Sequence, residues 1–415
     1  MQDDIPRPYT ILDGAAATNL FAAGMPREGV LYEEWILSHK EVLLSLQTDF
    51  VNAGASVLYT PTLTANEASL IRRGVEEPDV DSLNKSLAAL TITAAAGKAK
   101  VAGCLGPTGL ALAPAGETEF DELCQIYAEQ AGALDEAGVD LFVIETMVSV
   151  PEARAAVLAC RKYKKPVMVS MALNDDGELI AGGDPLACLI SMQALGVDAF
   201  GFNCGKSPAV MEEALRAIAP YASVPLLAKP SAGEPNPILP DQYEISPVML
   251  AKACEKLMDA GASIVGGCCG TTPEHIRAIA EMTKTYEKKP LPKLTTEQEN
   301  DIWLTNERSL FALDEERIEF TAPLNCGYDM SDDFLTAEND SYDVMLIRVE
   351  TPDDALDFAH NAPFAALPVC FQSDDPEALS RALFLYNGRA MVDSNCELED
   401  AQLQKIAARY GAFVY

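Results

Sequence analysis

Short apolar runs alternate with longer amphipathic stretches along residues 11–285. The apolar runs lack strict polar alternation, which is typical of parallel strands buried on both faces. The stretches between them repeat apolar residues at helical spacing, and turns rich in Gly, Pro or Asn separate the two kinds. Strands are expected at 10–14, 56–62, 100–109, 140–147, 166–174, 198–205, 225–233 and 263–270. Eight strand–helix units in about 275 residues predict an α/β fold of the (β/α)8 TIM barrel type.

Residues that can do chemistry gather where these expected strands end. They are Asp13, Gly14, Thr60, Thr62, 106–109, Glu145, Asn174, 203–205, 230–233, Cys268 and Cys269. A TIM barrel carries its active site at the carboxyl ends of its strands, because those ends share one face of the ring. The pattern therefore predicts a single active mouth.

The composition changes beyond residue 285. Residues 286–305 are charged and contain prolines, which predicts a linker between a barrel over 1–285 and a second domain over 306–415. Further strands are expected in DVMLIRVE, FAALPVCFQ, GRAMVDSN and AFVY, with helices between them. These strands make only about half of a closed barrel, so we expect a smaller, incomplete parallel α/β segment. Its edge needs cover, which favours a homo-oligomer or another partner.

The net charge of the chain limits the classes of partner that it can bind. The chain has 30 basic and 63 acidic side chains, a formal net charge of −33. Such a field repels phosphates and anionic lipids, so neither nucleic acid nor a membrane is expected as a partner. No apolar run reaches the about 18 residues of a membrane span, and acids and prolines stand where a signal peptide would be apolar. We therefore expect a cytoplasmic protein.

Eleven cysteines are too few and too scattered for a disulfide scaffold. Those in apolar helical patterns are expected core residues: Cys124, Cys160, Cys188 and Cys254. Cys204, Cys268 and Cys269 instead end the sixth and eighth expected strands, whose loops can converge. Three thiolates would give zinc three ligands and leave a fourth position open, as in catalytic sites. A redox switch between the adjacent cysteines and buried inert thiols are the alternatives.

The segments ILDGAAATNL, GCLGPTG, FNCG, KPSAGEP and GGCCGTTPEHI occur in this order. Together they resemble the homocysteine S-methyltransferase family, which includes betaine–homocysteine methyltransferase and the homocysteine-binding module of cobalamin-dependent methionine synthase. The resemblance covers residues 8–285 and implies a zinc-dependent methyltransferase that forms methionine from homocysteine. It implies Cys204, Cys268 and Cys269 as the zinc ligands. It further implies contacts to the amino and carboxylate groups of homocysteine from Asp13, Gly14, Thr62 and Glu145.

A zinc site suits methylation of a thiol. A free thiol has a pKa of about 8.5 and holds little thiolate at neutral pH, whereas coordination deprotonates it. Glu145 is suited to receive the ammonium of an amino-acid substrate. Ala17, Pro61 and Ser231 depart from residues common in the family, and we expect them to affect the substrate pocket and not the metal. His275 is expected to begin a helix rather than to bind metal.

Residues 368–415 resemble part of the pterin-binding domain of methionine synthase and corrinoid methyltransferases. Gln372 and Asp393 stand where that family has an acid and an asparagine that bind the pterin ring. We therefore expect a degenerate module, which packs on the barrel, self-associates or docks a partner, rather than a pterin site.

The methyl donor is open at this stage. No DxHxxG cobalamin motif occurs, so a methylcorrinoid would arrive on a separate protein; S-methylmethionine and a betaine-like onium compound are the other donors. Two alternatives to the main interpretation stand beside it. One is methylation of a different thiol. The other is a non-catalytic zinc-binding assembly subunit, in which a fourth ligand such as Cys104 would close the site.

Overall fold

The computed structural model describes residues 9–239 and 242–415. By their internal contacts these residues divide into two compact units. Unit 1 contains the described residues of Met1–Ala111, Asp121–Ala181 and Val197–Pro292, and unit 2 contains Leu112–Phe120, Gly182–Gly196 and Lys293–Tyr415. The domain limits expected from the sequence, 1–285, 286–305 and 306–415, stay a prediction.

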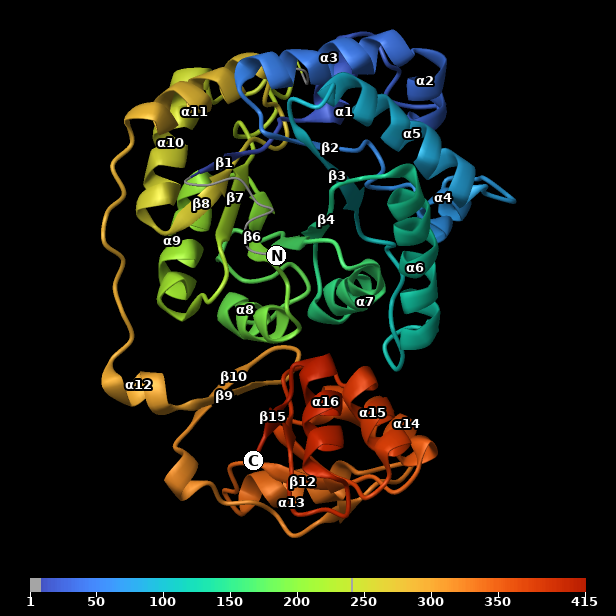
Figure 1. The fold of residues 1–415 in the computed structure, drawn as a ribbon, viewed down its shortest axis with the longest axis vertical. Helices are drawn as coiled ribbons and strands as arrows, with labels where there is room; N and C mark the ends of the chain where they lie inside the picture. The colour runs from blue at the N-terminus through green and yellow to red at the C-terminus, as the bar shows by residue number, and fades with distance from the viewer. Residues whose placement is uncertain (1–8, 240–241) are drawn as a thin grey trace. The chain divides into compact units, whose positions relative to one another are not determined.

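Eight parallel strands form one sheet in the described part of the chain (Figure 1). They are β1 (Thr10–Ile11), β2 (Val57–Tyr59), β3 (Lys100–Leu105), β4 (Leu141–Met147), β5 (Val167–Met171), β6 (Ala199–Cys204), β7 (Leu226–Pro230) and β8 (Ala262–Val265). The hydrogen-bonded order is β1-β8-β7-β6-β5-β4-β3-β2. A parallel bridge between Leu12 and Val57 joins the two ends of this order. The ring is therefore closed, and the predicted (β/α)8 barrel is confirmed.

Helices occupy the connections between these strands. They are α1 (Ala16–Ala22), α2 (Tyr32–Ser38), α3 (Lys40–Ala53), α4 (Glu67–Arg72), α5 (Val80–Ala95), α6 (Phe120–Ala137), α7 (Val150–Cys160), α8 (Pro185–Ala194), α9 (Pro208–Ile218), α10 (Pro247–Asp259) and α11 (Pro273–Thr285). Several begin with a polar cap followed by proline. At α8 the Asp184 carboxylate accepts from the Leu186 amide, and at α9 the Ser207 hydroxyl accepts from the Ala209 amide. Such starts fix the first turns of these helices.

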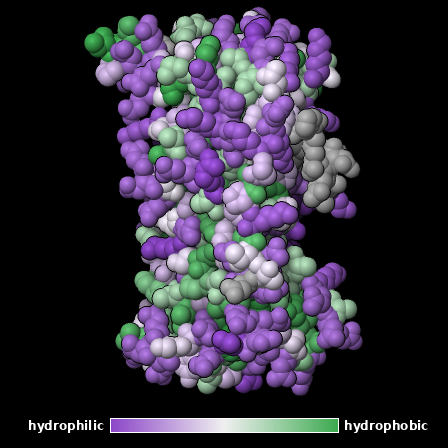
Figure 2. All heavy atoms as spheres, turned by 90° about the vertical axis from the view of Figure 1, so that its left-hand side faces the viewer, coloured by the Kyte–Doolittle hydropathy of each residue, from purple (hydrophilic) through white to green (hydrophobic). Residues whose placement is uncertain are grey.

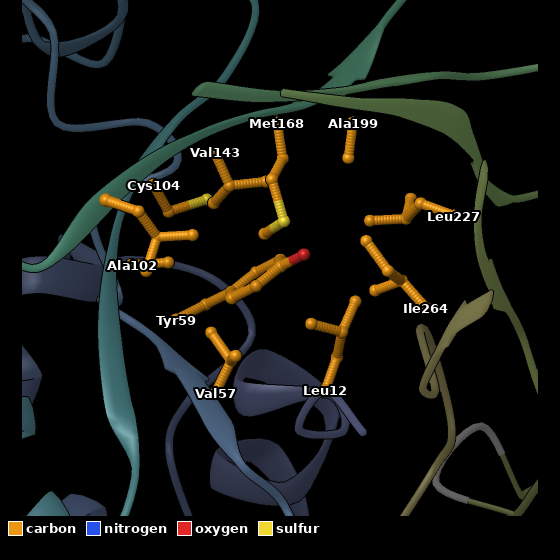
Figure 3. Close-up of a cluster of buried hydrophobic side chains, with 11 residues drawn as sticks. Leu12, Val57, Tyr59, Ala102, Cys104, Val143, Met168, Ala199, Leu227 and Ile264 are labelled. Atoms are coloured by element: carbon orange, nitrogen blue, oxygen red, sulfur yellow. The ribbon is translucent and has the colours of Figure 1, made fainter. Parts of the chain in front are cut away.

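Buried side chains fill the centre of the ring (Figure 3). The cluster consists of Leu12, Val57, Tyr59, Ala102, Cys104, Leu141, Val143, Met168, Ala199, Leu227 and Ile264. Every strand of the ring except β1 contributes a member, and Leu12 follows β1 directly. The interior is thus a packed core.

The C-terminal part of unit 2 forms two further sheets. An antiparallel pair, β9 (Ile302–Thr305) and β10 (Leu310–Leu313), was not expected from the sequence, where residues up to 305 were predicted as linker. The second sheet is parallel, with strands in chain order: β11 (Leu324–Asn325), β12 (Met345–Arg348), β13 (Val369–Gln372), β14 (Met391–Val392) and β15 (Phe413–Val414). The accompanying helices are α12 (Thr296–Asn300), α13 (Ser331–Asn339), α14 (Pro352–Asn361), α15 (Pro376–Leu385) and α16 (Asp400–Tyr410). This confirms a smaller, incomplete parallel α/β segment.

Three observations concern expected partners of the chain. No described helix combines the length and the apolar character needed to cross a bilayer. Hydrophilic side chains cover most of the face shown in Figure 2, in keeping with the large excess of acidic residues. At the ends of β13 and β14, the Gln372 amide donates to the Asp393 carboxylate at 2.8 Å. These two residues at the expected pterin positions thus bind each other.

Candidate metal centre

Cys204, Cys268 and Cys269 form one cluster at the mouth of the barrel. Their three sulfur atoms all lie within 4.8 Å of one another, and the Sγ atoms of Cys204 and Cys269 are 4.0 Å apart. All three are free thiols and are partly exposed. Cys204 is the last residue of β6, whereas the pair follows β8. The structure therefore brings together the three cysteines that the sequence analysis singled out.

The backbone around Cys204 is held in an uncommon conformation. Cys204 has φ +65° and Thr146, near the end of β4, has φ +62°, both in the left-handed region that few non-glycine residues adopt. Asn203 links the two positions. Its side-chain oxygen accepts from the Thr146 amide at 3.0 Å, and its NH₂ donates to the Thr146 hydroxyl at 2.7 Å and toward Cys268 Sγ at 3.8 Å. A buried amide therefore supports both the strained backbone and one of the sulfur atoms.

The adjacent cysteines lie in a tight turn that β7 supports. The Cys268 amide donates to the Pro230 carbonyl at 2.8 Å, and the Cys269 carbonyl accepts from the Ala232 amide at 2.8 Å. Gly270 follows with φ +75°, and a Cβ there would collide with the Tyr243 ring. Glycine is therefore required where the chain turns away from the sulfur atoms. This is how two neighbouring residues direct their side chains to one place.

The three thiols differ in how easily they ionise. Contacts with Cys268 and then Cys269 lower the pKa of Cys204, and a hydrogen bond from the Ser231 hydroxyl at 3.8 Å also stabilises its thiolate. The contact with Cys204 raises the pKa of both Cys268 and Cys269. The second and third ionisations are opposed because the negative charges would crowd together. A metal cation at the centre would remove that opposition, so the donor set suits one.

The number and type of donors favour zinc with an open position. Three soft thiolates match zinc, and three protein ligands are typical of catalytic zinc sites. Among the described residues, no histidine, carboxylate or further cysteine joins this group. Cys104, the candidate fourth ligand, lies elsewhere. It is buried in the barrel core, and its thiol points to Glu145 Oε2 at 3.8 Å.

A cavity of about 300 Å³ opens beside the sulfur atoms. Besides the three cysteines, its walls include Asp13, Gly14, Ala17, Tyr32, Tyr59, Pro61, Cys104, Glu145, Thr146 and Lys229. The cavity lining thus combines sulfur atoms with two carboxylates and an ammonium. Such a combination fits a small molecule that has a thiol and charged groups.

Asp13, Glu145 and Lys229 form a buried charged group in this wall. Lys229 Nζ lies 2.9 Å from Glu145 Oε1, 3.5 Å from Asp13 Oδ1 and 4.0 Å from the centre of the Tyr59 ring. Burial alone would lower the pKa of Lys229, but Glu145 and Asp13 more than offset it and raise that pKa. Burial raises the pKa of Glu145, and it raises the pKa of Asp13 to about 6. The lysine is therefore held charged between the carboxylates.

Asp13 has one oxygen without a hydrogen bond. Its Oδ2 accepts from the Tyr59 amide at 2.8 Å, which ties the end of β1 to β2. Its Oδ1 is buried and lacks a hydrogen-bond partner, since Lys229 approaches only to 3.5 Å. A buried acceptor left in this state is costly, and a ligand that donates to it would remove the cost.

The other residues considered from the sequence divide into three cases. Gly14 lines the cavity, and a Cβ on it would lie 2.6 Å from the Phe50 ring, so no larger residue fits. Thr62 does not line the cavity. It is fully buried, and its hydroxyl donates to the Cys104 carbonyl at 2.7 Å. Contacts of Asp13, Gly14, Thr62 and Glu145 with homocysteine stay predictions. His275 lies in the first turn of α11, as expected, and its Nε2 contacts the Ile245 carbonyl at 3.0 Å.

The expectation for Ser231 was wrong. Ala17 and Pro61 line the cavity, as the sequence analysis anticipated for all three departures. Ser231 instead donates its hydroxyl to Cys204 Sγ and so acts on a candidate metal ligand. The reason is the pairing of β6 with β7, in which Cys204 lies opposite Pro230, the residue before Ser231.

Lys229 lines the candidate site, and the sequence analysis missed it. It is the one basic residue in the apolar run PLLAKPSAG, which forms β7. A lysine inside a strand buried on both faces needs a counter-charge, because an unpaired buried ammonium is costly. The structure supplies that counter-charge from the ends of two strands that do not pair with β7, through Glu145 and Asp13.

Comparisons with known proteins agree with this geometry. The family model described as homocysteine S-methyltransferase matches residues 10–283. Methionine synthase of Mycobacterium leprae (strain TN) is 32% identical over 268 residues, which are 61% of this chain and 22% of that protein. Methionine synthase of Mycobacterium tuberculosis (strain ATCC 25618 / H37Rv) is 32% identical over 303 residues, 67% of this chain and 25% of that protein. The chain thus spans about a quarter of the length of these relatives.

A solved structure is similar along the barrel. The metallated form of the homocysteine methyltransferase MmuM from Escherichia coli superposes with a TM-score of 0.57 and 26% sequence identity. The match covers 66% of this chain and 96% of that one. The oxidized form of the same protein gives a TM-score of 0.56 and 27% identity.

Proposed function

Because the chain belongs to the homocysteine S-methyltransferase family, we propose that its barrel transfers a methyl group to the thiol of homocysteine, forming methionine, with zinc bound by Cys204, Cys268 and Cys269. The observation that carries this proposal is the position of the three sulfur atoms in the wall of a cavity that also has buried charged groups. Zinc, when bound, supplies an open position that keeps a substrate thiol ionised near neutral pH.

The residues of the chain have separate tasks in this proposal. Asn203 and Ser231 hold two of the sulfur ligands through their hydrogen bonds at 3.8 Å. Asp13 Oδ1, the buried acceptor without a hydrogen bond, receives the ammonium of the amino acid. The packed ring interior beneath the cavity excludes water from below. Together these residues orient the thiol toward the sulfur cluster and leave the methyl donor to approach from the mouth.

The methyl donor is part of the same proposal. We favour a methylcorrinoid carried by a separate protein; S-methylmethionine or another onium donor would use the same thiol site. Two relatives at 32% identity are methionine synthases, of which this chain spans about a quarter. To identify the donor, the purified chain is incubated with homocysteine and each donor in turn. The donor is the compound with which methionine forms.

The test of the proposed site is metal stoichiometry with and without homocysteine, on the wild type and on Cys268→Ala. We expect one zinc per wild-type chain, its loss in the variant, and release of a proton when homocysteine binds. Zinc that is bound but does not respond to homocysteine would contradict the substrate. A reduced wild-type protein that takes up no zinc would contradict the metal site.

A further inference from the structure

The two carboxylates in the cavity wall already have an ammonium of their own. Lys229 Nζ hydrogen-bonds Glu145 Oε1 at 2.9 Å and lies 3.5 Å from Asp13 Oδ1. Its remaining side faces the Tyr59 ring at 4.0 Å. The side chain is only 5% exposed, and it nevertheless lines the cavity. Glu145, which the sequence analysis assigned to the substrate ammonium, is thus paired before any substrate enters.

This pairing weakens the requirement that a bound thiol carry an ammonium. A site whose buried polar groups bind only the substrate rejects an analogue that lacks the matching group by about 10⁴-fold, because those groups are left unpaired. Here an analogue without an ammonium leaves Glu145 paired with Lys229. Of the two carboxylates, Asp13 alone has an oxygen without a hydrogen bond, and Lys229 still attracts it from 3.5 Å. The penalty for a missing ammonium is therefore limited to the contact at Asp13 Oδ1, which Lys229 already offsets in part.

We propose that Lys229 is a specificity-determining residue that takes the place of a substrate ammonium at Glu145, so that the cavity accepts mercapto-carboxylic acids without an α-amino group as well as homocysteine. This inference rests on the proposed thiol site beside the three cysteines. It extends the substrate class from amino-acid thiols to thiols that carry a carboxylate alone.

The experiment compares homocysteine with 4-mercaptobutanoate, which is homocysteine without its amino group. Each thiol is titrated into Co²⁺-reconstituted protein, and the sulfur-to-cobalt absorption band reports binding independently of turnover. For the wild type we expect the two dissociation constants to agree within about tenfold, far from the about 10⁴-fold of a site that depends on the ammonium. In Lys229→Met we expect the dissociation constant of 4-mercaptobutanoate to rise at least about tenfold more than that of homocysteine, since two carboxylates are then left without a cation.

Two further variants keep the test decisive if Lys229→Met does not fold. Lys229→Arg retains the cation, so the dissociation constants of the two thiols should stay as similar as they are in the wild type. Lys229→Met combined with Glu145→Gln removes one charge of each sign and leaves Asp13 as the one carboxylate of the pair without a cation, so its ratio of dissociation constants should lie between those of the wild type and of Lys229→Met. A wild-type protein that binds 4-mercaptobutanoate more than about 100-fold more weakly than homocysteine would overturn the inference. If neither thiol changes the cobalt band, the proposed function itself fails, which is a distinct result.

Discussion

The sulfur atoms of Cys204 and Cys269 lie 4.0 Å apart, although the two residues are 65 positions apart in the chain. Strand pairing brings them together: β7 lies between β6 and β8, and its end at Pro230 bonds to the Cys268 amide while pairing with Cys204. The sulfur cluster is therefore a product of the closed ring. Local sequence only places each cysteine at the end of its strand.

Loss of one sulfur ligand should abolish tight metal binding. In Cys268→Ala we expect metal affinity to fall at least about 100-fold. Even the loss of a residue that only hydrogen-bonds to a metal ligand lowers affinity by up to about that factor. Cys254→Ala is the matched control, since Cys254 is fully buried in α10 away from the cluster. Competition with a chromophoric chelator measures both affinities. Equal affinities in the two variants would show that the cluster does not hold the metal.

The side chain of Asn203 should matter to the metal without being a ligand. It joins Thr146 to Cys268 Sγ, so Asn203→Ala frees both the left-handed turn and the sulfur atom. We expect metal affinity to fall by about tenfold while one metal per chain still binds at saturation. The exposed Asn395→Ala is the control, and chelator competition is again the measurement. An unchanged metal affinity in Asn203→Ala would show that the hydrogen bond from Asn203 to Cys268 does not contribute to metal binding.

The barrel could be predicted from the sequence because its signals are local. The runs DLFVIETM and DAFGFNCG are mainly apolar without polar alternation, and they form β4 and β6 because a strand covered on both faces buries such a run. The cysteines followed from the rule that strand ends share one face. The count of eight strand–helix units was then enough to predict that the ring closes.

What the sequence did not disclose depends on contacts between strands. Lys229 pairs with Glu145, 84 residues earlier, and nothing local to β7 names that partner. The direction of Ser231 toward Cys204 follows from the register of β6 on β7, which composition cannot give. The β9–β10 pair was missed because its turn signal is one asparagine. The Asn306 side-chain oxygen accepts from the amides of Arg308 and Ser309, directly after the stretch that was predicted as a charged linker.

Stability should depend on pH through Asp13. Burial raises its pKa from 3.8 to about 6, so the folded protein binds a proton that the unfolded chain has released between these values. Stability contributed by this group is present below the unfolded pKa and is lost as the pH rises through the folded one. The whole change is worth about 3 kcal/mol, of which about 1 kcal/mol falls between pH 5 and pH 7.

Asp13→Asn isolates that effect, because asparagine can still accept from the Tyr59 amide. Urea unfolding of both metal-free proteins at pH 5, 6 and 7 measures the difference in their free energies of unfolding. We expect the wild type to lose stability relative to the variant as the pH rises. A difference that is constant across this range would mean that Asp13 does not titrate there.

Gly201 should be indispensable to the pairing of β6 with β7. A Cβ at this position would collide with the Leu227 carbonyl oxygen and lie 2.6 Å from the carbonyl carbon. These are backbone atoms of the next strand, so the two strands would have to separate, and the sulfur ligand at the end of β6 would move with them. We expect Gly201→Ala to lower the free energy of unfolding by about 3 kcal/mol and to weaken metal binding. Gly327→Ala is the control, because nothing lies within 4 Å of a Cβ there. Thermal unfolding followed by circular dichroism distinguishes them, and equal midpoints would refute the argument from strand contact.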